Sequence, residues 1–193
     1  MKLDILAIGA HPDDVELGCG ATLPKEIASG KKVGILDLTR GELGTRGSAE
    51  IRDKEALKAS EILGAVFREN LAFSDGFFSN DKRHQLEVVK ILRKYQPEIV
   101  LCNAVEDRHM DHPKGSKLVS DACFLSGLRK VETEYDGNPQ KSWRPKQVHP
   151  FSSSTCCFNS NESWSVVQVI VSDCLGIDLS VCSVVFGLPS FTL

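Results

Sequence analysis

The sequence has no apolar run long enough to span a membrane. A transmembrane helix needs about 18 consecutive apolar residues, and no segment of the 193-residue chain approaches that length. The opening residues, Met1-Lys2-Leu3-Asp4, include an acid, and no long apolar segment follows that would make a signal peptide. We therefore expect a cytoplasmic protein that has no membrane partner.

An excess of basic residues is also missing. The formal net charge is −3, whereas a surface that binds nucleic acid carries clustered Lys and Arg. We therefore expect no nucleic-acid partner. The seven cysteines are an odd number, and none of those before residue 150 stands in CxxC spacing. We expect mostly reduced thiols rather than a disulfide framework.

Basic residues disappear altogether near the end of the chain. All 23 Lys and Arg lie within residues 1–150, and the segment after them is rich in serine and cysteine. We expect a catalytic domain over residues 1–146 and an atypical Ser/Cys-rich tail over residues 147–193. Two interpretations of the tail stay open. One is a shift of the reading frame near Gln147–Pro150; the other is an authentic β-rich tail with strands at Val166–Val171 and Val181–Phe186.

Apolar runs alternate with segments of helical spacing along the first part of the chain. Strands are expected at residues 3–9, 33–39, 66–72 and 99–103, and helices within 17–29, 48–63, 82–95 and 114–128. This alternation predicts βαβ units and hence an α/β, Rossmann-like three-layer fold with a mostly parallel sheet. In the common 3-2-1-4 order, the first and fourth strands are neighbours. Ligands bind beyond the carboxyl ends of strands at such a switch point.

Two clusters of metal-ligand residues follow these two strands. His11, Asp13 and Asp14 come after the first strand. His109, Asp111 and His112 come after the fourth. Imidazole and carboxylate are the ligands of zinc and similar ions. The sequence therefore predicts one metal site built from two loops.

The clusters hold enough groups for catalysis as well as binding. His11, Asp14 and His112 can supply three ligands, which is the pattern of a catalytic zinc site with an open fourth position. Asp13 is the spare carboxylate that can take a proton from water, and His109 can donate a proton or stabilise an oxyanion. Asp111 can hold His109 in its charged form and orient it. Metal-assisted hydrolysis of an amide or ester uses all of these groups.

Each cluster also has a plainer interpretation. His-Pro-Asp-Asp can be a polar strand-to-helix turn in which Asp14 caps the helix, and residues 109–112 can be a solvated loop. Their joint position at the ends of neighbouring strands favours the metal site. Gly18-x-Gly20 lacks the third glycine of a dinucleotide fingerprint, so a nucleotide-binding module is not expected.

Arginines gather after the second expected strand. Arg40, Arg46 and Arg52 can be surface charges or ion pairs, but their nearness to a strand end makes recognition of an anion a second interpretation. Arg suits bidentate binding of carboxylate or phosphate better than Lys does. Arg40 and Arg52 are therefore our candidate substrate-binding residues.

The two clusters resemble the motifs of the LmbE-like (PIG-L) family of zinc-dependent N-acetylglucosamine deacetylases. The family marks are AHPDDxE, here Ala10–Glu16, and HxDH, here His109–His112. The resemblance covers about residues 1–146. Within the family the chain looks most like the bacillithiol-biosynthesis deacetylases, which hydrolyse N-acetylglucosaminyl malate to glucosaminyl malate and acetate. Related enzymes are often homo-oligomers, so the resemblance also implies a homo-oligomer.

The resemblance assigns a role to each matching residue. It implies a Zn²⁺ site made by His11, Asp14 and His112, with Asp13 as general base. His109 becomes the acid or electrostatic stabiliser, supported by Asp111. Arg52 matches the family arginine that contacts substrate, and the malate carboxylates would suit it.

The chain departs from the family pattern beyond Lys146. Family members continue further and carry a tyrosine that polarises the substrate carbonyl, a position that neither Tyr95 nor Tyr135 fits. Loss of one oxyanion donor lowers a rate by about 10²–10³. Two alternatives therefore stay open: a deacetylase of another N-acetyl sugar, such as N,N′-diacetylchitobiose or a mycothiol-type precursor, and a truncated chain that binds metal without turnover.

Overall fold

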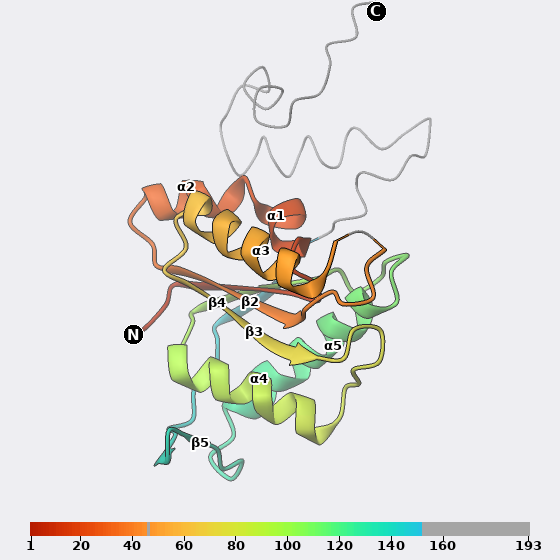
Figure 1. Ribbon diagram of the computed structural model, residues 1–193. Helices are drawn as coiled ribbons and strands as arrows, with labels where there is room; N and C mark the ends of the chain where they lie inside the picture. Colours follow the sequence, from red (N-terminus) through yellow and green to blue (C-terminus); the bar gives the residue numbers. More distant parts are fainter. Residues whose placement is uncertain (46, 152–193) are drawn as a thin grey trace, which may run out of the picture. The chain divides into compact units, whose positions relative to one another are not determined.

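A computed structural model of the chain describes residues 1–45 and 47–151. Within these residues a five-stranded parallel sheet is covered by helices on both faces (Figure 1). In spatial order its strands are β3 (Phe67–Phe73), β2 (Val33–Thr39), β1 (Ile5–Gly9), β4 (Ile99–Cys102) and β7 (Gln147–Pro150). The expected α/β fold and the expected 3-2-1-4 order are confirmed.

The helices lie in two layers. One face of the sheet is covered by α1 (Asp14–Cys19), α2 (Thr22–Ala28) and α3 (Ala49–Leu63), and the other by α4 (Lys82–Tyr95) and α5 (Asp111–Ser126) (Figure 1). The short strands β5 (Glu134–Tyr135) and β6 (Asn138–Pro139) pair as a separate antiparallel hairpin. In the part of the chain that the structure describes, no helix combines the length and the apolar character that a membrane span requires.

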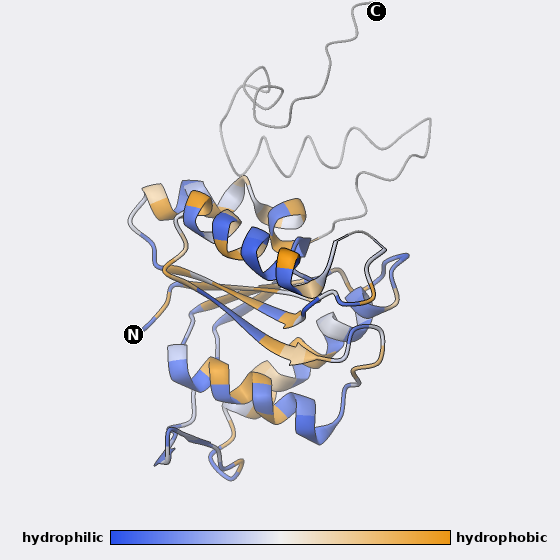
Figure 2. Cartoon of the chain, in the orientation of Figure 1, coloured by the Kyte–Doolittle hydropathy of each residue, from blue (hydrophilic) through white to orange (hydrophobic). Residues whose placement is uncertain are grey.

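Strand β1 supplies the centre of two hydrophobic cores. Leu6 and Ile8 pack on the side of α4 and α5, whereas Ile5 and Ala7 pack on the side of α1 and α2. All four side chains are buried, as expected for a parallel strand covered on both faces. Figure 2 shows apolar strands between helices that carry both polar and apolar residues, and some of the apolar ones, such as Leu57 and Ile62 of α3, are exposed. The carboxyl end of β1 is thereby fixed from both sides.

Two expected helix ends are confirmed. Ser48 caps α3, because its hydroxyl accepts a hydrogen bond from the amide of Ile51 at 3.4 Å. Gly64 ends the helix with a φ of 79°, in the left-handed region that glycine adopts without strain. The long helix after the arginine-rich loop is therefore encoded locally at both ends.

Other boundaries differ from the expectation. The helix expected within residues 17–29 is two helices, α1 and α2, and Pro24 lies in the first turn of α2, where a missing amide is tolerated. The helix expected from Lys114 starts at Asp111 instead, because Pro113 is likewise accepted in a first turn. His112 therefore stands on a helix rather than in a loop.

Strand β7 lies just beyond the expected end of the domain at Lys146. Its residues pair in parallel with β4, with Gln147 opposite Ile99 and Pro150 opposite Cys102. A strand of four residues is too short to show a clear alternation in sequence. The rest of the tail, including the two strands expected at residues 166–171 and 181–186, lies outside the described residues.

A buried ion cluster ties α1 to strands β2 and β3. The guanidinium of Arg68 donates to both carboxylate oxygens of Asp37, at 2.7 and 2.9 Å, and it also pairs with Glu16. The side chains of Arg68 and Asp37 are each 2% exposed. Such a pair stabilises the fold only while both partners are present, because an unpaired buried charge is costly.

Replacing Arg68 should therefore weaken the fold strongly. We expect Arg68→Met to lower the free energy of unfolding by about 3–5 kcal/mol, because Asp37 and Glu16 lose the cation between them. Urea denaturation measures the change. The control is Lys58→Met, which removes an exposed pair with Glu61 and should cost less than about 1 kcal/mol. An Arg68 variant as stable as this control would contradict the account of the cluster.

Candidate metal centre

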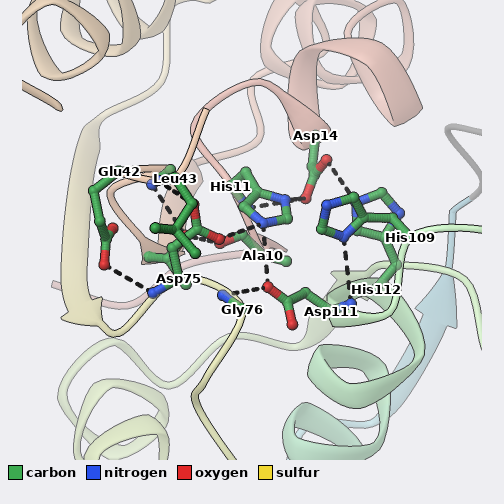
Figure 3. Close-up of polar contacts among 12 residues, drawn as sticks. Ala10, His11, Asp14, Glu42, Leu43, Asp75, Gly76, His109, Asp111 and His112 are labelled. Carbon is green, nitrogen blue, oxygen red and sulfur yellow. Dashed lines mark hydrogen bonds and ion pairs between the residues drawn. The ribbon is translucent and has the colours of Figure 1, made fainter. Parts of the chain in front are cut away.

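The two predicted clusters meet at the carboxyl ends of β1 and β4. Asp14, the first residue of α1, lies between His11 and His112 (Figure 3). One carboxylate oxygen is 3.4 Å from Nδ1 of His11, and the other is 3.2 Å from Nε2 of His112. All three residues are buried. The structure thus brings together the predicted metal ligands.

Asp14 is held in place by its neighbours on both strands. The backbone amide of His11 donates to Oδ2 of Asp14 at 2.9 Å, and Nδ2 of Asn103 donates to the same oxygen at 3.0 Å. Asn103 follows β4 directly, and its own Oδ1 accepts the amide of Ala10 at 2.8 Å. The asparagine therefore fixes the loop after β1 against the end of β4.

The spacing of these groups fits a zinc ion. Ligand atoms 2.0–2.1 Å from a tetrahedral zinc lie about 3.3 Å from one another, close to the separations from Oδ2 of Asp14 to His11 and from Oδ1 of Asp14 to His112. Among the described residues, the groups that offer three ligand atoms within 4.8 Å of one another do not include Asp14; they are His11, His109 and His112, and His11, Asp75 and Asp111. The donor set of imidazole and carboxylate is that of zinc and related transition metals.

Charge interactions keep Asp14 ionised. Burial alone would raise its pKa, but hydrogen bonds from His11 and His112 lower the pKa well below its usual range. Burial lowers the pKa of His112, yet its bonds to Asp14 and Asp107 outweigh this effect and raise the pKa to about 9. The pKa of His11 is raised by Asp14 in the same way, against burial. A metal at this site would therefore compete with protons for the two rings.

Asp13 and His109 are exposed beside the buried ligands. Asp13 is the N-cap residue of α1, but its side chain makes no capping hydrogen bond. Removal of water by its neighbours and the charge of Asp14 raise the pKa of Asp13, against the lowering effects of Arg52 and His11. Its carboxylate is thus available to a ligand at the mouth of the site.

His109 lies over the other two histidines. Its ring centroid is 4.6 Å from that of His11 and 4.9 Å from that of His112. Desolvation and the charges of these two rings lower the pKa of His109, and they outweigh the opposing effect of Asp111. Asp111 acts in the expected direction, because its charge favours the protonated ring of His109.

Asp111 is fully buried and is linked to His109 through its backbone. Its amide donates to Nδ1 of His109 at 3.3 Å. Its carboxylate accepts hydrogen bonds from the amide of Gly76 and from Lys114, both at 2.8 Å, and lies 3.5 Å from Nε2 of His11. Because Nδ1 of His109 accepts a bond, a neutral ring carries its proton on Nε2.

The predicted arginines lie in different surroundings. Arg40 pairs with Asp53 and, at 3.5 Å, with Glu50, so its guanidinium turns toward α3. Arg52 lies against the turn after β2, where a Cβ added to Gly41 would come within 2.3 Å of its Nη1. The charge of Arg52 lowers the pKa of Asp13. Arg52 therefore lies nearer to the candidate centre than Arg40 does. Arg46 lies outside the described residues.

Sequence reasoning missed several residues of the centre. Asn103 was expected only as the last residue of a strand, and Asp75 and Asp107 were given no role. Oδ1 of Asp75 is 3.1 Å from Nε2 of His11, and Oδ2 of Asp107 is 3.0 Å from Nδ1 of His112. Asp107 stands shortly before the HxDH motif and is not part of it. The one signal in the sequence that could have indicated Asp107 is that an acid stands close to a predicted histidine ligand.

The geometry predicts one metal ion per chain. Purified protein incubated with Zn²⁺ and then desalted should retain about one ion, and Asp14→Ala should abolish retention because Asp14 is central to the site. Metal analysis by mass spectrometry measures this. The matched control is His84→Ala. This variant removes a histidine on α4 that pairs with Asp81, and it should leave zinc retention unchanged. Equal retention by wild type and Asp14→Ala would contradict the assignment.

Comparison with known proteins places the site in a family. The sequence model of the PIG-L family, described as GlcNAc-PI de-N-acetylase, matches residues 6–123. The chain is 39% identical over 114 residues to the uncharacterized deacetylase YaiS of Escherichia coli K12, covering 56% of this chain and 61% of that protein. It is 33% identical over 134 residues to the diacetylchitobiose deacetylase of Thermococcus kodakarensis, covering 64% and 50%.

A relative with another named activity also matches. The chain is 26% identical over 158 residues to the 4-oxalmesaconate hydratase of Pseudomonas putida KT2440, covering 74% of this chain and 61% of that protein. Among solved structures, the conserved protein TT1542 from Thermus thermophilus matches with a TM-score of 0.72 and 42% identity, covering 78% of this chain and 66% of that one.

The chain spans only half to three fifths of the length of the two deacetylases named above. The matched region nevertheless contains both metal-ligand clusters, strands β2 to β4 and all of β1 except Ile5. The chain belongs to the PIG-L family.

Proposed function

We propose that this chain is a zinc-dependent deacetylase that removes the acetyl group from an N-acetylglucosaminide. The observation that carries the proposal is the buried Asp14 between His11 and His112, with Asp13 and His109 exposed beside it. The names of the deacetylase relatives support the reaction class. Hydrolysis also requires that water and the amide carbonyl of the substrate meet at the site. Asp13 and His109 are exposed, so a ligand can approach them.

The residues of the chain divide the reaction between them. Zinc held by His11, Asp14 and His112 would supply a Lewis acid and lower the pKa of a bound water to about 7. Asp13 takes the proton of the attacking water. The Nε2 proton of neutral His109 donates a hydrogen bond to the oxygen on which negative charge develops. The water oxygen bonds to the carbonyl carbon, and the proton that Asp13 has taken passes to the amide nitrogen as the C–N bond breaks, which yields acetate and the free amine of the sugar.

The substrate that we propose first is N-acetyl-D-glucosaminyl L-malate, the precursor in bacillithiol biosynthesis. Arg52 lies close enough to influence Asp13 and can bind the malate carboxylates. N,N′-diacetylchitobiose and mycothiol-type precursors are alternatives, of which the first is supported by the name of one relative. A further alternative is a chain that binds metal without turnover. The hydratase relative supports one more candidate reaction, the hydration of an unsaturated acid.

Acetate release from N-acetylglucosaminyl malate tests the proposal. The purified 193-residue chain, with metal content measured on the same sample, should release acetate, and Asp13→Ala should slow release by about 10²–10⁴-fold while it retains the metal. Glu61→Ala, which removes an exposed carboxylate on α3 that faces Lys58, is the control and should be nearly as active as wild type. Metal retention without acetate release would show that the site forms but does not turn over. Undiminished activity of Asp13→Ala would contradict its role as base.

Substitution of Arg52 separates the candidate sugars. Charge-assisted hydrogen bonds contribute about 1.5–3 kcal/mol, so Arg52→Gln should raise KM for N-acetylglucosaminyl malate by about tenfold or more. The uncharged N,N′-diacetylchitobiose should show little change in KM. Steady-state kinetics with both sugars measure the difference. An equal rise in KM for both would mean that Arg52 does not recognise the carboxylates.

A further inference from the structure

We propose that Asp75 and Asp107 position the two histidine ligands of the metal centre, each by accepting a hydrogen bond from the ring nitrogen that faces away from Asp14. The inference rests on the metal site of the proposed function. It assigns a role to two carboxylates that lie outside both sequence motifs. They come from the loop after β3 and the loop after β4.

The two histidines turn opposite nitrogens toward Asp14. His11 approaches with Nδ1, at 3.4 Å, and His112 approaches with Nε2, at 3.2 Å. If these atoms bind the metal, each must offer a free lone pair, and the other nitrogen of each ring must carry the proton. The site therefore requires His11 with its proton on Nε2 and His112 with its proton on Nδ1.

A carboxylate faces each of these protonated nitrogens. Oδ1 of Asp75 is 3.1 Å from Nε2 of His11, and Oδ2 of Asp107 is 3.0 Å from Nδ1 of His112. The side chains of Asp75 and Asp107 are 8% and 5% exposed, so water competes little for these contacts. Metal-bound histidines commonly donate their second N–H to a carboxylate, which fixes the tautomer and the ring orientation.

Each carboxylate is itself anchored through its other oxygen. Oδ2 of Asp75 accepts the amide of Leu43 at 3.0 Å, and the amide of Asp75 donates to Glu42 at 2.8 Å. Oδ1 of Asp107 accepts the amide of His109 at 3.0 Å. One oxygen of each residue thus fixes a loop while the second oxygen faces a histidine ring.

Asp111 is the other carboxylate near His11, and it is less well placed for this role. Its Oδ2 is 3.5 Å from Nε2, longer than the 3.1 Å of Asp75. The same oxygen already accepts the amide of Gly76, and Oδ1 accepts Lys114. Asp111 adds negative charge beside the ring, whereas Asp75 makes the directed hydrogen bond.

Zinc affinity of the intact chain tests the inference without reference to turnover. We expect Asp75→Asn and Asp107→Asn each to raise the zinc dissociation constant by about 10–100-fold, measured by competition with a chelator. Because each aspartate also accepts a backbone amide, from Leu43 or from His109, the two variants test the inference independently on two different loops. Urea unfolding of each metal-free variant shows whether the fold is retained.

The chain offers a matched control in Asp81→Asn. Asp81 contacts Nδ1 of His84 at 2.9 Å and caps α4, so this variant alters a similar Asp–His pair outside the metal centre. Its zinc dissociation constant should equal that of wild type. An equal loss of affinity in this control would show a general effect of stability and would overturn the inference.

The remaining outcomes separate this inference from the proposed function. Unchanged zinc affinity in both variants, with a raised KM for the sugar, would mean that these carboxylates bind substrate and would overturn it. Wild-type protein that binds no zinc would overturn both proposals. Zinc binding that weakens in both variants, in a chain that releases no acetate, would support this inference while the deacetylase proposal fails.

Discussion

The contact of one carboxylate, that of Asp14, with histidines from two loops is the constraint on which the centre depends. It requires the carboxyl ends of β1 and β4 to be neighbours, and the parallel pairing of these strands provides this. Asn103 then joins the two loops, because it binds both Ala10 and Asp14. The apolar packing on both sides of β1 keeps this arrangement rigid. The order of the strands in the sheet therefore decides whether these side chains can meet.

Negative charge dominates the surroundings of His11. Asp14, Asp75 and Asp111 all lie within 3.5 Å of its ring nitrogens. Buried carboxylates are costly unless a cation or several hydrogen bonds compensate them. Backbone amides and Lys114 supply part of that compensation, and a divalent ion between the histidines would supply more. The charges of Asp14 and Asp75 also raise the pKa of His11 against the effect of burial.

The sequence predicted the strand order and the meeting of the two motifs, because apolar runs and metal-ligand spacing are local patterns. It did not predict Asn103, Asp75 or Asp107 as parts of the centre. Each of these is an ordinary strand-end or turn residue whose role depends on a contact with a distant loop. The start of α5 at Asp111 was missed because Pro113 looks like a helix boundary, although a first turn accepts it. The expected role of Arg52 concerns a contact with a ligand rather than a contact within the chain.

Anomalous diffraction at the zinc absorption edge, from crystals of the intact chain grown with Zn²⁺, tests the central claim most directly. The account predicts one strong peak about 2.0–2.2 Å from Nδ1 of His11, a carboxylate oxygen of Asp14 and Nε2 of His112. A peak between His11, Asp75 and Asp111, a group of possible ligands among the described residues that does not include Asp14, would contradict it. The absence of any peak near these side chains would do so as well.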